Sequence, residues 1–297
     1  MLSFGLILIT SLFFTGIIGR TKSLMAGRKG PDVFQPIKNV LLLLRKGSVF
    51  SSTSGLITQL APTISLATVL TAALLVPFNG QQAVISFSYD FVLFAYLLAL
   101  GRFFMIIAAL DAGSSFQGMG AARESLYSML LEPAFFMILA SFCLITHNSS
   151  FAGIFSSLGQ MNTEFLLAAV LAIFVFVNIA LVENSRLPVD DPKTHLELTM
   201  IHEVMVLDLC GFDLGLVQIT SFLKFAIFGT LIANCVMPGF IPVIAQIAIY
   251  FAIQMLFAIV IGSVESFRAR NRLNRNAQYI LAVVAISLIA FVLTLFL

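Results

Sequence analysis

The chain has 297 residues and a formal net charge of +2; 60% of its residues are hydrophobic, 10% are charged, and its mean hydropathy is +1.05. Apolar runs such as LLAAVLAIFVFVNIALV exclude a soluble globular domain, and their lack of apolar–polar alternation excludes a membrane β-barrel. The composition therefore predicts an all-α, polytopic membrane protein that forms a single integral membrane domain over residues 1–297. The isolated cysteines Cys143, Cys210 and Cys235 form no C-x-x-C pair, which is typical of small apolar core residues rather than of a zinc or iron–sulfur site.

Eight apolar segments are each close to the ~20 residues that cross a bilayer. In chain order they cover residues 2–19, 55–78, 87–111, 126–146, 164–184, 214–236, 240–264 and 277–297. Between the first two lies VFQPIKNVLLLLRKGSVF, whose apolar run is too short to cross and is interleaved with Lys38, Arg45 and Lys46. We expect an amphipathic helix at the membrane interface here, with a re-entrant or buried helix as the alternative.

The basic residues fall on one side of the predicted membrane. All sixteen Lys and Arg except Arg102 and Lys224, which lie within spans, occur in the loops after the first, third, fifth and seventh spans. The opposite loops, 79–86, 147–163 and 237–239, contain none. Because cytoplasmic loops carry the excess of Lys and Arg, we expect the basic side to be cytoplasmic and both termini to lie on the far side.

The third and fourth spans carry embedded charges. Arg102 and Asp111 are nine residues apart, about half a turn out of phase, so we expect each to meet a partner on another helix instead of each other. Glu132 precedes Pro133, whose missing N–H frees a carbonyl and can bend the helix. A kinked span with a carboxylate suits a proton path; a structural carboxylate bonded to a neighbouring helix is the alternative.

A short stretch between the fifth and sixth spans, ENSRLPVDDPKTHLELTMIHEVMVLDLCGFD, holds half of the chain's acidic residues. These are Glu183, Asp190, Asp191, Glu197, Glu203, Asp208 and Asp213. Charge beside a bilayer is costly, so such a cluster usually marks an ion path, a substrate chamber or a docking surface.

Lys224 lies eleven residues after Asp213, nearly three helical turns, so the two share a face if the helix is continuous. An ammonium flanked by carboxylates is typical of a proton relay, whereas a lysine that snorkels to the interface is the alternative. His202 and Glu203 begin HEVMV, in which Val206 replaces the second histidine of the H-E-x-x-H zinc pattern. With no P-loop, dinucleotide fingerprint or nucleophile elbow either, the chain offers no site of its own for bond-making chemistry.

The whole chain resembles the respiratory complex I subunit 1 family, and two segments carry this resemblance. GRKGPDVFQPIKNVLLLLRK is similar to the family's arginine–glycine–proline segment and its following amphipathic helix. ENSRLPVDDPKTHLEL resembles the family's acidic cytoplasmic loop, whose pattern is matched by Glu183, Arg186, Pro188, Asp190 and Glu197. The resemblance implies an eight-span subunit that joins a membrane arm to a peripheral arm.

The third loop places the resemblance on a particular branch. RFFMIIAALDAGSSFQGMGAARESLYSMLLEP is similar to the membrane subunit of formate hydrogenlyase and other energy-converting (group 4) nickel–iron hydrogenases. The matching positions are Arg102, Asp111, Gly113, Ser114, Gly120, Arg123, Glu124 and Glu132. The first loop also lacks the N-R-V-G-P segment of complex I, so the hydrogenase-type branch is favoured over quinone-linked complex I.

This resemblance implies a non-redox subunit of a multisubunit, ion-translocating oxidoreductase in a prokaryotic cell (inner) membrane. The expected partners are hydrogenase-like large and small subunits on the cytoplasmic side, antiporter-like membrane subunits and the lipid bilayer. The nickel–iron centre and iron–sulfur clusters would sit in those partners, with no cofactor, metal or nucleic acid held by this chain. The alternatives are a quinone-chamber subunit of complex I and a stand-alone secondary ion transporter; the latter predicts inverted repeats, which the sequence does not display.

The resemblance also implies roles for the charged residues. The expected proton-path and coupling residues are Glu132, Glu183, Asp190, Glu197, Glu203, Asp213 and Lys224. The expected structural or interface charges are Arg102, Asp111, Arg123, Glu124 and Arg186, and we expect Arg123 and Arg186 to pair with acids, Arg186 with Glu183 if the helix persists. Lys193 and His195 stand where the family has further glutamates, and Glu203 is only a rough counterpart of the family's next acid, so the acidic chamber is incomplete.

Overall fold

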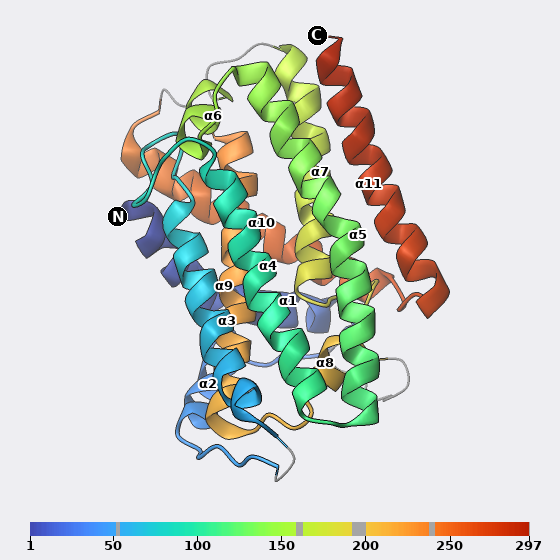
Figure 1. The fold of residues 1–297 in the computed structure, drawn as a ribbon. Coiled ribbons are helices and arrows are strands. Elements are labelled where there is room, and N and C mark those ends of the chain that lie inside the picture. The colour runs from blue at the N-terminus through green and yellow to red at the C-terminus, as the bar shows by residue number, and fades with distance from the viewer. Residues whose placement is uncertain (52–53, 159–162, 192–199, 238–240, 297) are drawn as a thin grey trace.

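A computed structural model of the chain describes residues 1–51, 54–158, 163–191, 200–237 and 241–296. These residues form helices only, with no strand among them (Figure 1). The helices are α1 (Leu2–Met25), α2 (Gln35–Leu44), α3 (Leu56–Leu75), α4 (Asp90–Asp111), α5 (Ser115–Thr146), α6 (Phe151–Leu158), α7 (Thr163–Glu183), α8 (His202–Met205), α9 (Gly211–Val236), α10 (Val243–Phe267) and α11 (Leu273–Leu295).

Eight of these helices are long and apolar enough to cross a membrane, one for each predicted span. They are α1, α3, α4, α5, α7, α9, α10 and α11. The predicted all-α, multi-pass fold is thereby confirmed. The ten-residue α2 forms where the amphipathic helix was expected, packed against α1 and α9, and α2 and α8 lie near one end of the bundle while α6 lies near the other (Figure 1).

The start of α5 differs from the prediction. The helix begins at Ser115 instead of residue 126, so Arg123 and Glu124 are helical and do not lie in a loop. Gly113 adopts a left-handed φ of 71°, and Ser114 then supplies the extended N-cap conformation. The first turns are polar, yet they bury Gln117, Gly120, Ala121 and Glu124 at helical spacing. Helical periodicity therefore continues where hydropathy falls.

The helix α9 is the centre of the bundle. It packs against α1, α2, α3, α7 and α10, and two-thirds of its most apolar segment is buried. Phe225, Ala226, Ile227 and Phe228 follow Lys224 and are all buried. A helix that packs on most of its sides leaves only a narrow stripe for lipid. Lys224 is accordingly surrounded by protein.

The close approach of α1 to the first loop requires a glycine. A Cβ added at Gly16 would overlap the carbonyl of Val33, whereas a Cβ at Gly19 on the same helix meets open space. We expect Gly16→Ala to destabilise the protein by about 1–3 kcal/mol through overpacking. Gly19→Ala, the matched control, should be neutral or stabilising by up to about 1 kcal/mol because alanine favours a helix. Thermal unfolding of the detergent-solubilised complex measures both changes, and equal effects would contradict this packing.

Candidate functional site

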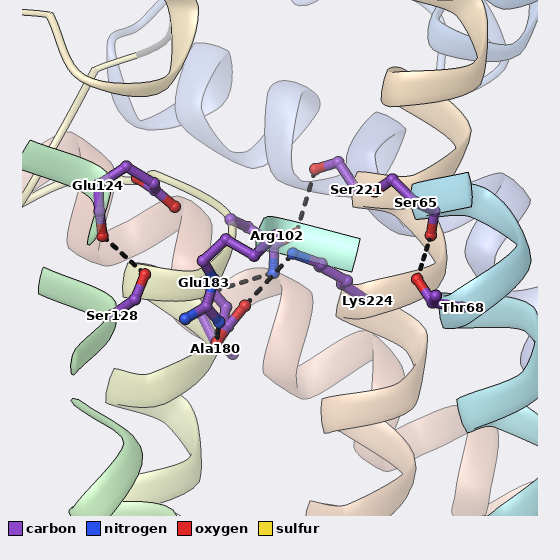
Figure 2. A network of polar contacts seen from close by, with 10 residues as sticks. Ser65, Thr68, Arg102, Glu124, Ser128, Ala180, Glu183, Ser221 and Lys224 are labelled. Carbon is purple, nitrogen blue, oxygen red and sulfur yellow. Dashed lines mark hydrogen bonds and ion pairs between the residues drawn. The ribbon is translucent and has the colours of Figure 1, made fainter. Parts of the chain in front are cut away.

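Glu183, the last residue of α7, lies between two buried cations. Its carboxylate forms an ion pair with the guanidinium of Arg102 from α4, and the Nζ of Lys224 from α9 lies 3.3 Å from its Oε2 (Figure 2). The side chains of Arg102, Glu183 and Lys224 are only 8%, 7% and 13% exposed. Three spans are thus joined by charge inside the bundle, and Lys224 does not snorkel to the interface.

A fourth charged residue completes this site. Glu124 of α5 is buried and lines a cavity of about 40 Å³ together with Arg102, Glu183 and Lys224. These four residues, called here the charge cluster, contain two cations and two carboxylates, so their formal charges balance. Burying an unpaired ion costs several kcal/mol, which explains the balance. The cavity of about 40 Å³ exceeds the ~10–15 Å³ that one water needs, and its lining is polar, so it has room for a water molecule.

Glu132 points out of the chain. It is exposed on α5 and lines a groove of about 520 Å³ along α4 and α5, to which Arg102 also contributes. A smaller cavity of about 30 Å³ is lined by Glu132, Arg102 and Glu183. Within the described part of the chain, no hydrogen bond or ion pair reaches Glu132, which argues against a carboxylate bonded to a neighbouring helix of this chain. The helix α5 runs unbroken through Pro133.

Asp111 acts at a helix end and does not contact Arg102, as their offset predicted. Its Oδ2 accepts hydrogen bonds from the backbone N–H of Gly55 (2.8 Å) and from the hydroxyl of Thr58 (2.8 Å), at the start of α3. A carboxylate at a helix N-terminus satisfies free N–H groups and complements the helix dipole. Each member of the pair therefore meets another helix, which confirms the expectation.

Arg186 pairs with an acid, as expected, but its partner is not Glu183, because the helix on which that pair depended does not persist. The helix α7 ends at Glu183, and Ser185 turns the chain with a left-handed φ of 49°, so the spacing of three residues no longer brings the side chains together. Arg186 instead lies 3.1 Å from Glu265 of α10 and over the ring of Phe225. Glu265, which is buried, also pairs with Lys22 of α1 at 3.4 Å. Sequence reasoning missed Glu265, although a lone carboxylate in the last turn of an apolar span was a usable signal.

For Arg123, in contrast, the prediction of an acidic partner is wrong among the described residues. Its guanidinium donates to the carbonyl of Met200 (3.0 Å) and to the Sδ of Met119 (2.9 Å). Because Arg123 is helical, its side chain reaches across α5 to the backbone just before α8. It still holds the geometry of the acidic stretch, through a carbonyl and not a carboxylate.

Asp190 joins the two described parts of the acidic stretch, residues 183–191 and 200–213. It is buried, pairs with Arg270 at 2.8 Å, and accepts from the backbone N–H groups of Asp191, Ile201 and His202 at 2.9–3.1 Å. Burial raises the pKa of Asp190, and the opposing effects of Arg270 and these N–H groups are smaller. From the sequence, Arg270 served only as one of the basic loop residues that set the orientation in the membrane, so its pair with Asp190 was not predicted.

Two further predicted acids, Asp213 and Glu203, do not line the cavity of the charge cluster. Asp213 is buried in the first turn of α9, and one of its oxygens has no hydrogen-bond partner among the described residues. The helix α9 is continuous, so Asp213 and Lys224 share a face as predicted. Glu197, Lys193 and His195 lie outside the described residues.

A cavity larger than that of the charge cluster lies between α1, α2, α9 and the segment after α7. This outer cavity measures about 410 Å³ and is lined by both apolar and charged side chains. The charged ones are Lys22, Arg186, Glu203 and Glu265. The 40 Å³ cavity that contains the charge cluster is called the inner cavity below.

A family model described as NADH dehydrogenase matches residues 1–295. The chain belongs to this family. Membership confirms the resemblance to the complex I subunit 1 type that the acidic loop and the first loop carried. The chain is therefore a multi-pass membrane protein of the NADH dehydrogenase family, and its described residues include eight helices long and apolar enough to cross a bilayer.

Proteins similar to this chain include subunits named for hydrogenases. Hydrogenase-4 component C of Escherichia coli (strain K12) is 31% identical over 193 residues, which cover 65% of this chain and 61% of the relative. Formate hydrogenlyase subunit 4 of the same organism is 27% identical over 184 residues, covering 62% and 60%. An NADH-quinone oxidoreductase subunit of Koribacter versatilis (strain Ellin345) is 24% identical over 184 residues, covering 58% and 43%. The matches thus span less than two-thirds of each relative's length.

A solved structure shares the fold over nearly its full length. A chain of the membrane-bound sulfane sulfur reductase, an archaeal respiratory membrane complex, superposes with a TM-score of 0.84 at 19% identity. The match covers 99% of this chain and 97% of that one. At this identity the likeness concerns the fold alone.

Proposed function

We propose that this chain is the non-redox membrane subunit of a multisubunit oxidoreductase of the energy-converting hydrogenase type. It anchors a peripheral hydrogenase-like module at its basic, cytoplasmic end and couples that module's redox reaction to the translocation of protons or sodium ions. The observation that carries the proposal is Glu183, held between Arg102 and Lys224 at the point where α7 passes into the acidic stretch. The names of the two Escherichia coli relatives support the hydrogenase branch.

The coupling works through electrostatics. A change of charge in a partner bound at the acidic stretch alters the balance of nearby ionisable groups, and interacting groups exchange protons as a unit. The ion pair of Asp190 with Arg270 holds the acidic stretch in place. A partner that binds the stretch therefore acts on a positioned segment, which begins at Glu183. The redox centres sit in partner subunits in this proposal, and this chain supplies only the titratable path.

The route ends at Glu132. An ionisable side chain at bilayer depth normally pairs within protein or faces water, so an outward carboxylate calls for a neighbouring subunit. The groove along α4 and α5 provides the surface for that neighbour, and the 30 Å³ cavity connects Glu132 to Glu183 and Arg102. An antiporter-like membrane subunit that covers this groove would take over the ion.

We expect Glu132→Gln to lower the number of ions translocated per electron pair roughly tenfold or more while redox turnover is retained, because the amide keeps the shape but cannot take up a proton. The measurement is ion uptake into vesicles that contain the purified complex, with turnover recorded in parallel. Asp208→Asn, an exposed acid between α8 and α9, is the matched control and should behave as wild type. Unchanged translocation in Glu132→Gln would remove this residue from the path.

The identity of the partner distinguishes the branches. Mass spectrometry of the complex purified with this chain should find a large subunit with two C-x-x-C nickel-ligand pairs, and a partner without them would contradict the hydrogenase assignment. Ion flux through the single chain in liposomes would instead support a stand-alone transporter.

The outer cavity favours one second candidate, a quinone-chamber subunit of the complex I type. Its volume of about 410 Å³ falls within the range of small-molecule sites, and it opens beside α2 between apolar and charged walls. Quinone-dependent turnover of the purified complex would support this candidate, whereas hydrogen evolution that is insensitive to added quinone would exclude it.

A further inference from the structure

The outer and inner cavities share a wall. Four residues line both: Asn184, His202, Val217 and Ser221. On one side of this wall lies the 410 Å³ outer cavity with Glu203 and Glu265, and on the other lies the 40 Å³ inner cavity with the charge cluster. A proton that passes between the two cavities must cross this wall.

His202 is the titratable residue of the wall. Val217 has no polar side-chain atom, and the two other polar members are bonded to partners. The hydroxyl of Ser221 donates to the Oδ1 of Asn184 (3.1 Å), and the Nδ2 of Asn184 donates to the carbonyl of Ala180 (2.9 Å). Neither an amide nor an alcohol gains or loses a proton near neutral pH, whereas an imidazole does.

The backbone of His202 is fixed in place. Its N–H donates to the Oδ2 of Asp190 (3.1 Å), which is itself paired with Arg270. The short helix α8 that it begins packs on α5, where a Cβ at Gly120 would lie 2.8 Å from the carbonyl of Ile201 and 3.1 Å from Met205. This support keeps the imidazole at the wall while charges on either side change.

We propose that His202 carries protons between the outer cavity and the charge cluster, an inference that rests on the proposed coupling function. One ring nitrogen takes a proton from water or an acid of the outer cavity, and the other nitrogen releases its proton to a water or a deprotonated group of the inner cavity. The ring is then neutral again but in its other tautomer, and a rotation of the ring restores the starting arrangement, so one proton enters, one leaves and no electrons move.

The charged groups around His202 come from several helices. The acidic stretch contributes Asp190 and Glu203, the outer cavity adds Lys22, Arg186 and Glu265, and the inner cavity adds Arg102, Glu124, Glu183 and Lys224. Cations and carboxylates therefore line the cavities on both sides of His202.

The test uses His202→Gln and His202→Ala in the purified complex reconstituted in vesicles. Both variants should lower the ions translocated per electron pair roughly tenfold or more, with redox turnover retained. Added free imidazole should restore coupling in His202→Ala, most strongly near the pKa of imidazole, because it refills the space left by the ring. His147→Gln, which changes a histidine at the far end of α5, is the matched control.

Three results would overturn the inference. Normal translocation in His202→Gln, with Lys224→Ala uncoupled, would exclude His202 while leaving the proposed function intact. Uncoupling that free imidazole does not restore, in a complex whose subunits remain assembled by size-exclusion chromatography, would assign His202 a purely structural role. Normal translocation in both His202→Gln and Lys224→Ala would remove the proposed function as well.

Discussion

Glu183→Gln is expected to destabilise the protein by about 3–5 kcal/mol and to abolish coupled ion translocation. The substitution leaves Arg102 and Lys224 buried without the carboxylate that lies between them. The charge cluster then holds two cations and only Glu124, so its charges no longer balance. Thermal unfolding of the solubilised complex measures the first effect, and ion uptake into vesicles measures the second.

A double substitution separates stability from function. Adding Lys224→Met to Glu183→Gln removes one cation and restores the balance between Arg102 and Glu124, so we expect part of the lost stability to return. Translocation should stay absent, because two titratable groups of the path are gone. Asp208→Asn serves as the control for loss of an acid from the same stretch. Recovery of translocation in the double variant would show that Glu183 and Lys224 act only in packing.

Asp190→Ala is expected to have the second largest effect, a loss of about 3 kcal/mol or more together with release of the peripheral subunits. The change removes the carboxylate that pairs with the guanidinium of Arg270 and that accepts from the backbone N–H groups of Ile201 and His202. The two described parts of the acidic stretch then lose the side chain that joins them. Thermal unfolding and co-purification of partner subunits are the measurements.

A double-mutant cycle with Arg270→Ala isolates the ion pair within this effect. We expect the two changes together to be less damaging than the sum of the single changes, because removal of both partners leaves no buried charge unpaired. If the two effects were fully additive and Asp190→Ala still co-purified with the peripheral subunits, Asp190 would not hold the surface that binds those subunits.

Hydropathy was sufficient to locate the eight spans but not to locate all of their ends. Each of the eight spans appears, because about 20 apolar residues in a row have few other stable placements. The start of α5 was missed because its first turns, with Arg123 and Glu124, are polar yet amphipathic. Hydropathy averages over all faces of a helix, whereas burial depends on one face.

The members of the charge cluster were visible in the sequence, but their pairing was not. Arg102, Glu183 and Lys224 stood out as charges within or beside apolar spans, and Glu124 through the family resemblance. Which of them meet depends on how α4, α5, α7 and α9 pack, and spacing along one helix carries no information about that packing. The same limit explains why Glu265 was missed as the partner of Arg186 and Arg270 as the partner of Asp190.

The number of ions moved per electron pair tests the central claim most directly. The purified complex is placed in sealed vesicles, the redox reaction is started, and ion uptake and turnover are recorded together for wild type and for Lys224→Ala. The account predicts turnover in both samples and ion uptake only in wild type. Equal ion uptake per electron pair in Lys224→Ala would contradict the claim that this chain couples redox chemistry to ion movement through its charge cluster.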